Sequence, residues 1–373
     1  MASFRKRGVK WEYRIKYIDY STGKKRETTK GGFKTKKEAQ IAAAKIEEDI
    51  RQNTFVKESN MTMYTLIDKW IQLKTNSYKP TTFSVFSGIM HNRIAKKFGY
   101  ANINNITTLG IQEWYVNLQN EGLTPKYIRT IHNVLRALFN DAKSWGLISN
   151  NIMNDVLPPK IPKHPRNFLT LDMALNVIEY AKNNTNHGYT IELALFTGMR
   201  RGEIHGLKWV DINMDKKLIN ISRQANSVSG KGVIIQTPKT SQSVRLISIP
   251  EFLVDSLKEW QLIQRKECLK YGQPWTDDFF VTTASFKPTD GKAAGRALTA
   301  TCKALGYSHV RFHDLRHSHA SIMLEIGENL KSISERLGHK SISITMDLYS
   351  HISLEMKEIS SDRLNKAVKT RMN

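Results

Sequence analysis

A cluster of prolines divides the chain near its middle. Residues 158–165 read PPKIPKHP, so four of the ten prolines fall within eight residues. Proline fixes φ and lacks an N–H donor, so this segment cannot continue a helix and favours an extended linker. A chain of 373 residues is long enough to bury two or three cores. We therefore place a domain boundary here and expect separately folded units on its two sides.

The first block, residues 1–55, predicts a small sheet backed by one helix. Residues 11–17 alternate apolar and charged side chains, which is the period of a half-buried strand. A turn at 21–25 and a returning strand follow. Thr35 and Glu38 have the spacing of a capping box that starts a helix. The apolar residues behind it share one helical face: Ala39, Ala42, Ala43, Ile46 and Ile50.

The next two blocks differ in their patterns. Residues 61–157 predict a compact domain of roughly four helices, because helix-start signals precede apolar stripes of helical period. Residues 166–373 predict helices to about residue 209, then strands around LINIS, GVIIQ and VRLISI, then helices again. The expected fold class is a multidomain, mainly α protein whose last domain is α+β. The helix starts in the second block are Thr62, Pro80, Thr107 and Thr124.

The charge of the chain favours a polyanionic partner. The sequence has 57 Lys plus Arg against 34 Asp plus Glu, a formal charge of +23, which suits nucleic acid or an anionic membrane surface. No stretch approaches 18 consecutive apolar residues, and the basic start MASFRKRGVK has no apolar segment behind it. We expect a nucleic acid partner and a soluble, unexported protein.

Cysteine usage agrees with a reducing compartment. Cys268 and Cys302 lie far apart, without C-x-x-C spacing. This pattern excludes a zinc ribbon and gives no sign of a disulfide framework. We expect no metal and no cofactor.

Short polar motifs in the last block carry the candidate chemistry. Each is weak by itself, since a lone arginine, histidine or tyrosine is usually structural. Their order is informative: an arginine, a lysine in a predicted β-turn, an H-x-x-R pair on one helical face, a histidine, and a tyrosine ten residues after it. The candidate catalytic residues in this order are Arg200, Lys239, His313, Arg316, His339 and Tyr349.

This ordered set resembles the tyrosine recombinase (phage integrase) family, whose site combines two arginines, a lysine, two histidine positions and a nucleophilic tyrosine. The resemblance covers most of the chain. It implies a catalytic domain at 166–373, a helical core-binding (SAM-like) domain at 61–157, and an arm-type DNA-binding domain with a three-stranded sheet at 1–55. It implies a site-specific recombinase that integrates and excises a phage or transposon through a Holliday junction.

The chemistry explains these residue types. A phosphodiester under attack carries charge on its nonbridging oxygens, and Arg200 and Arg316 can neutralise it bidentately without a metal. Tyr349, a phenol with an ordinary pKa near 10, must lose its proton before it can attack. His313 fits the general base. Glu203, which shares a motif with Arg200, is expected to orient it.

The resemblance assigns the remaining roles. Lys239 would donate a proton to the departing 5′ oxygen, and His339 would hydrogen-bond the phosphate. The product would be a 3′-phosphotyrosyl enzyme. One phosphoester replaces another, so neither ATP nor Mg²⁺ is expected to be needed.

Three alternatives remain open at this point. A type IB topoisomerase has nearly the same chemistry but no need of a second DNA address. A non-catalytic DNA-binding regulator is disfavoured by the intact set of site residues. A metal-dependent phosphohydrolase built on His313 and Asp314 lacks further ligands with suitable spacing. His317, His319 and His351 also suggest a metal, but the first two lie two apart on a predicted helix and point away from each other.

The resemblance implies a monomer in solution that becomes a homotetramer on double-stranded DNA with core and arm-type attachment sites. An excisionase or a DNA-bending protein is a possible accessory partner. The expected location is the cytoplasm of a prokaryotic host, at the nucleoid. A helix from about residue 353 could pack in a neighbouring protomer or on its own domain.

The basic residues that could insert the front sheet into a DNA groove, by either face, are Arg14, Lys16, Lys24, Lys25 and Arg26.

Overall fold

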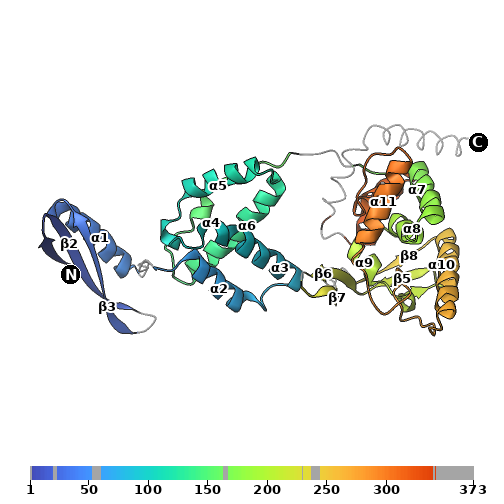
Figure 1. Cartoon of the computed structure of the whole chain (residues 1–373), viewed down its shortest axis with the longest axis horizontal. Helices are drawn as coiled ribbons and strands as arrows, with labels where there is room; N and C mark the ends of the chain where they lie inside the picture. Colours follow the sequence, from blue (N-terminus) through green and yellow to red (C-terminus); the bar gives the residue numbers. More distant parts are fainter. Residues whose placement is uncertain are drawn as a thin grey trace, which may run out of the picture. The chain divides into compact units, whose positions relative to one another are not determined.

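The chain forms two compact units, residues 1–163 and 164–373, in a computed structural model (Figure 1). Among the described residues, no helix is long and apolar enough to cross a membrane. The structure describes residues 2–19, 23–52, 60–162, 167–228, 230–236, 244–338 and 341.

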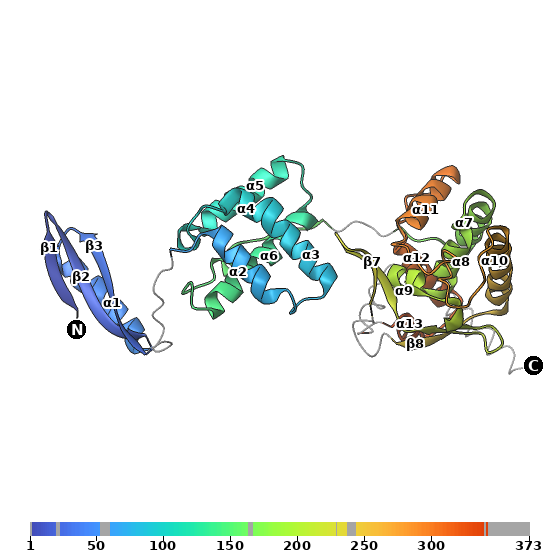
Figure 2. The ribbon, with the colours of Figure 1, turned by 60° about the horizontal axis from the view of Figure 1, so that its bottom comes forward.

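The first unit begins with a three-stranded antiparallel sheet in the order β1 (Ser3–Arg7), β2 (Lys10–Asp19) and β3 (Lys24–Phe33). Helix α1 (Lys36–Arg51) covers one face of it (Figure 2). The alternation predicted for β2 is confirmed, because Tyr13 and Ile15 are buried on the helix side, whereas Arg14 and Lys16 are exposed.

The N-terminus of α1 confirms one half of the predicted capping box. The Thr35 hydroxyl accepts from the Glu38 N–H at 3.2 Å. The Glu38 carboxylate, however, accepts from the Lys34 N–H at 2.9 Å rather than from the N-cap residue itself. The reciprocal bond is therefore displaced by one residue.

The rest of the first unit is helical, as predicted. Thr62, Thr107 and Thr124 each cap a helix through their side chains, and Pro80 occupies the first turn of another. Trp70 is fully buried, and its indole N–H donates to Asp141 at 2.8 Å. The elements are α2 (Met63–Lys74), α3 (Pro80–Ile89), a π-helical turn (Met90–Ile94), α4 (Ala95–Phe98), α5 (Thr108–Asn120), α6 (Pro125–Ser144), and 3-10 turns at Ile103–Asn105 and Ile152–Asn154.

The second unit is α+β, as predicted. A three-stranded antiparallel sheet, in the order β4 (Ile212–Asn213), β5 (Leu218–Ile221) and β8 (Arg245–Ser248), lies beside the helices, and a separate hairpin of β6 (Gln224–Val228) and β7 (Gly232–Gln236) lies at the edge of the unit (Figure 1). Its core joins the sheet to the surrounding helices. The helices are α7 (Leu171–Asn184), α8 (Gly188–Thr197), α9 (Arg201–Gly206), α10 (Glu251–Lys270), α11 (Lys292–Ala304), α12 (Asp314–Glu325) and α13 (Leu330–Leu337), with a 3-10 turn at Trp209–Asp211.

Candidate active site

Arg200 lies at the turn between α8 and α9. The turn is made by Gly198, whose φ of 64° is left-handed and ends α8. Glu203, in the first turn of α9, accepts from the Arg200 backbone N–H at 2.9 Å and from its Nη1 at 2.8 Å. The remaining terminal nitrogen, Nη2, donates to the Gly338 carbonyl at 2.6 Å. The expectation that Glu203 orients Arg200 agrees with these contacts.

Arg316 is buried in α12 and is 4% exposed. Its Nη1 donates to the Gly198 carbonyl at 2.8 Å, and its Nη2 donates to the Leu337 carbonyl at 2.6 Å. Burial, followed by the charge of Arg200, lowers the pKa of Arg316 to about 9, which leaves it charged at neutral pH. These carbonyls orient the guanidinium without neutralising its charge.

Arg245, which the sequence interpretation missed, completes the support of Glu203. Its Nη1 and Nη2 bind the two carboxylate oxygens of Glu203 at 3.1 and 3.0 Å. Burial by itself would raise the pKa of Glu203, but the hydrogen bonds and charges of Arg245 and Arg200 outweigh it and hold that pKa below its usual range. A signal for Arg245 was available: it lies two residues before buried Ile247 and therefore faces the same side of β8.

The three arginines converge on the C-terminal end of α13. The last carbonyls of a helix lack intrahelical partners and carry the negative end of the helix dipole, so they are natural acceptors for cations. Gly338, with φ of 65°, ends the helix in the left-handed conformation. Three successive carbonyls each accept from a different arginine: Arg336 O from Arg245 Nε at 2.8 Å, Leu337 O from Arg316 Nη2 at 2.6 Å, and Gly338 O from Arg200 Nη2 at 2.6 Å.

His313 directly precedes α12; the residue is exposed overall, but its ring lies against that of His317. Desolvation, with the neighbouring charge of Arg316, lowers its pKa below the ordinary value, so the imidazole is neutral at pH 7 and can accept a proton. Asp314 instead binds Arg311 through both carboxylate oxygens, at 2.8 and 2.9 Å. Among the described residues, no group of three or more His, Cys, Asp or Glu side chains lies close enough to hold a metal ion.

Comparison with known proteins identifies this arrangement. A family model described as the phage integrase family matches residues 167–356. The chain belongs to this family. Models described as an arm DNA-binding domain and as a phage integrase N-terminal SAM-like domain match residues 3–50 and 62–119 of this integrase-family chain.

Similar proteins and solved structures agree with this family assignment. A tyrosine recombinase XerC-like protein of Caldanaerobacter subterraneus subsp. tengcongensis is 31% identical over 353 residues, covering 89% of this chain and 90% of the relative. The Tn1549 transposon integrase in complex with transposon right end DNA is similar in fold, with a TM-score of 0.65 and 23% identity over 82% of this chain and 100% of that chain. A lambda integrase tetramer bound to a Holliday junction gives a TM-score of 0.56 and 21% identity over 91% of this chain and 95% of that chain. The chain is thus a tyrosine recombinase, an enzyme that cleaves and rejoins DNA.

The structure brings together Arg200 and Arg316 of the predicted site, with His313 beside Arg316. Lys239, His339 and Tyr349 lie outside the described residues. So do His351 and the helix expected from about residue 353.

The basic residues of the front sheet divide between its two faces. In the β2–β3 register, Arg14 lies opposite Thr29, Lys16 opposite Glu27, and Ile18 opposite Lys25. Cross-strand partners share a face, so Arg14, Lys16 and Lys25 lie on the face away from α1. Lys24 and Arg26 lie opposite Asp19 and Tyr17, on the helix side. The register of β1 adds two basic residues that were not predicted to the open face: Arg5 and Arg7.

A basic cavity of about 560 Å³ is lined in part by residues that are neighbours of the site residues in the sequence. Arg201 follows Arg200, and Arg311 and Phe312 precede His313. Its lining has no acidic side chain. Within the described part of the chain, the side chains of Arg296 and Lys303 make no hydrogen bond or ion pair. The lining residues are Arg201, Gly291, Lys292, Gly295, Arg296, Thr299, Ala300, Lys303, His309, Arg311 and Phe312.

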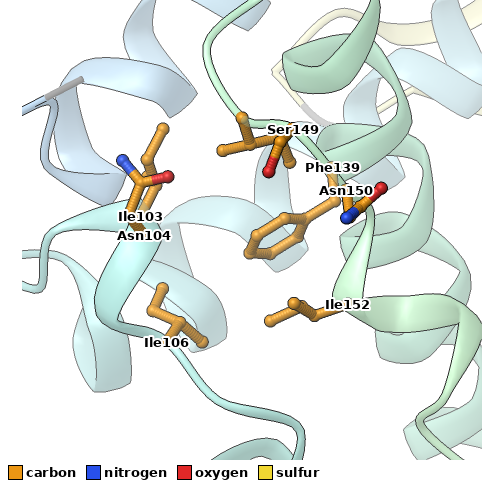
Figure 3. Close-up of a pocket in the computed structure, with 8 residues that line it drawn as sticks. Ile103, Asn104, Ile106, Phe139, Ser149, Asn150 and Ile152 are labelled. Atoms are coloured by element: carbon orange, nitrogen blue, oxygen red, sulfur yellow. The ribbon is translucent and has the colours of Figure 1, made fainter. Parts of the chain in front are cut away.

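A cavity of about 180 Å³ in the first unit has a different character (Figure 3). The Phe139 ring lies among isoleucine side chains, with amide and hydroxyl groups at the rim. No lining residue is ionisable, so the cavity offers no acid, base or charged anchor. Its lining residues are Ile103, Asn104, Ile106, Phe139, Ile148, Ser149, Asn150 and Ile152.

Proposed function

We propose that the chain is a site-specific integrase that cuts and rejoins DNA through a 3′-phosphotyrosyl bond on Tyr349. The observation that carries the proposal is the convergence of Arg200 and Arg316 on one helix end. Arg316 is bound by carbonyls, so its charge remains available to a phosphate. Arg200 shares its charge with Glu203 but lies at the same helix end, and two guanidiniums there suit the two nonbridging oxygens of a single phosphodiester.

The remaining residues supply the proton transfers. The Tyr349 oxygen bonds to phosphorus while its proton passes to His313. The bond from phosphorus to the 5′ oxygen breaks, and Lys239 gives that oxygen its proton. His339 hydrogen-bonds the phosphate. The products are a 3′-phosphotyrosine and a 5′ hydroxyl, so the number of phosphoesters is unchanged, and a 5′ hydroxyl from a second duplex can reverse the step through a Holliday junction. No metal or ATP enters this balance.

The proposed division of labour follows the blocks of the sequence. Residues 166–373 perform catalysis, residues 61–157 bind the core site, and residues 1–55 bind a second, arm-type site. The open face of the front sheet and the cavity around Arg296 and Lys303 offer phosphates unpaired or exposed cations, and phosphate contacts position most DNA-binding proteins. Four protomers would act on two duplexes, and this proposal is supported by the similar lambda integrase, which is a tetramer when bound to a Holliday junction.

The biological task that follows is integration and excision of a mobile element such as a phage or transposon. An excisionase or a DNA-bending protein would set the direction. The DNA substrate places the reaction at the nucleoid, in the cytoplasm of a prokaryotic host.

Trapping the covalent intermediate tests this function. A nicked duplex carrying the core attachment site loses the short strand after cleavage, so religation stops and the adduct accumulates. We expect a denaturant-resistant adduct, formed in excess EDTA, in which Tyr349 of the linked peptide is joined to the 3′ phosphate at the cut. A 5′ linkage, a different residue, or dependence on a divalent cation would contradict the mechanism. Relaxation of supercoils without joining of two specific sites would favour a type IB topoisomerase.

Deleting residues 1–55 tests whether this domain binds a second, arm-type DNA site. We expect binding to the distal arm-type site to disappear, since the sheet that carries Arg14 and Lys16 is removed, whereas cleavage of a core duplex remains detectable. Electrophoretic mobility shifts with separate arm and core duplexes measure the first effect, and adduct formation measures the second. Equal loss of both would refute this division.

A further inference from the structure

The side chain of Arg336 ties the end of α13 to three other elements. Its Nε donates to His319 Nε2 on α12 at 3.1 Å. Its Nη1 donates to the Ser248 carbonyl at the end of β8 at 2.8 Å, and its Nη2 donates to the Phe196 carbonyl on α8 at 3.2 Å. All the nitrogens of the guanidinium thus contact separate acceptors, although no carboxylate is among them.

His319 is arranged to receive this bond. It is 3% exposed, and its Nδ1 lies 2.8 Å from the Leu195 carbonyl. A carbonyl can only accept, so Nδ1 carries the hydrogen and Nε2 offers its lone pair to Arg336. Burial, with the charge of Arg336 next, lowers the pKa of His319 to about 3, so the ring stays neutral at working pH. A neutral ring with both nitrogens engaged orients its neighbour.

The apolar support of α13 is small. The cluster beneath it contains four buried residues, Ala320, Leu324, Ile333 and Leu337. The carbonyl of Arg336 and the two after it hold Arg245, Arg316 and Arg200. The side chain of Arg336 therefore fixes a turn of backbone that in turn fixes every guanidinium of the site.

We propose that Arg336, seated on His319, is a positioning residue: it sets the angle of the α13 end and thereby aligns Arg200 and Arg316 for the phosphate. This inference rests on the function proposed above. Arg336 acts through the backbone of its own turn and through the two arginines.

The test compares Arg336→Gln with Lys331→Gln, which removes the same charge from an exposed position on the same helix. DNA affinity and the single-turnover rate constant for cleavage of prebound nicked duplex are measured separately, below the melting temperature of each protein. We expect Arg336→Gln to keep wild-type affinity but to cleave about 100-fold more slowly, since a misplacement of roughly 1 Å has that effect. Lys331→Gln should cleave at the wild-type rate.

Two further variants keep the proposal testable if Arg336→Gln folds poorly. Arg336→Lys retains a cation that can reach one carbonyl and should recover part of the rate. His319→Phe keeps a buried ring but removes the acceptor for Nε, so it should slow cleavage without weakening binding.

A substrate with a neutral methylphosphonate at the scissile position separates positioning from general stability. It removes the charge that the two arginines neutralise, so the defect of Arg336→Gln should be at least about tenfold smaller than on the phosphodiester. A wild-type cleavage rate in Arg336→Gln would overturn the proposal. So would parallel loss of binding and cleavage, or the same defect on both substrates. Failure of the wild-type protein to form its Tyr349 adduct would refute the proposed function itself, which distinguishes the two outcomes.

Discussion

Replacing Tyr349 with phenylalanine is expected to abolish the covalent adduct completely while leaving DNA affinity unchanged. The phenyl ring has no oxygen to bond to phosphorus, and no other group in the proposed site can take its place. The substitution removes a hydroxyl that is uncharged at neutral pH, so it changes neither the positive surface nor the arginine cluster. Adduct formation on nicked core duplex, followed on a denaturing gel, measures the first effect, and an electrophoretic mobility shift measures the second.

Tyr271→Phe provides a matched control. Tyr271 is 71% exposed at the end of α10. Removal of its hydroxyl should therefore have no effect on cleavage. An adduct trapped in Tyr349→Phe would assign the nucleophile to another residue and overturn the mechanism.

Replacing Arg316 with alanine should have the next largest effect, a fall of about 10²- to 10³-fold in the rate of cleavage of prebound DNA, as for other lost donors to a developing anion. It should also destabilise the fold, because the buried carbonyls of Gly198 and Leu337 lose their donors at about 1–3 kcal/mol for each group. Single-turnover cleavage and a thermal melt separate the two effects.

Arg316→Lys distinguishes charge from geometry. Lysine keeps a positive charge, but its single ammonium cannot reproduce the fork that binds Gly198 and Leu337 at once. We therefore expect a rate between those of the wild type and the alanine variant. Arg265→Ala, at a half-exposed arginine of α10, controls for the loss of one positive charge. Cleavage at the wild-type rate in Arg316→Ala would remove this residue from the chemistry.

Local signals in the sequence were sufficient for most of the fold. Thr62, Thr107 and Thr124 mark helix starts because a cap acts on the backbone two or three residues away. Strand β2 was predictable because one face of it is buried and the other is open. The family resemblance predicted a third strand in this sheet, but the residue pattern did not locate β1, since SFRKR contains only one large apolar residue, Phe4, and the strand is ordered by pairing with β2.

The site was predictable to the extent that its motifs have a fixed order along the chain. The positions of Arg200 and Arg316 followed from that order, but their partners did not. Arg245 contacts the carbonyl of Arg336 across 91 positions, and Arg200 contacts that of Gly338 across 138. No local pattern encodes such pairs. His317 and His319 were correctly expected to point apart, because two positions along a helix separate their directions: the ring of His317 lies against His313, and His319 points to Leu195.

The shared support of the three arginines has an evolutionary consequence. Successive carbonyls of one helix end cannot shift independently, so a substitution that tilts the end of α13 changes the alignment of every cation at once. Mutations at Arg336, Gly338 and Glu203 should therefore show strong epistasis, since the second one damages an arrangement that the first has already lost. Near the end of α13, single substitutions that leave cleavage unchanged should be rare. Sequence changes there should instead be accepted as several substitutions that occur together.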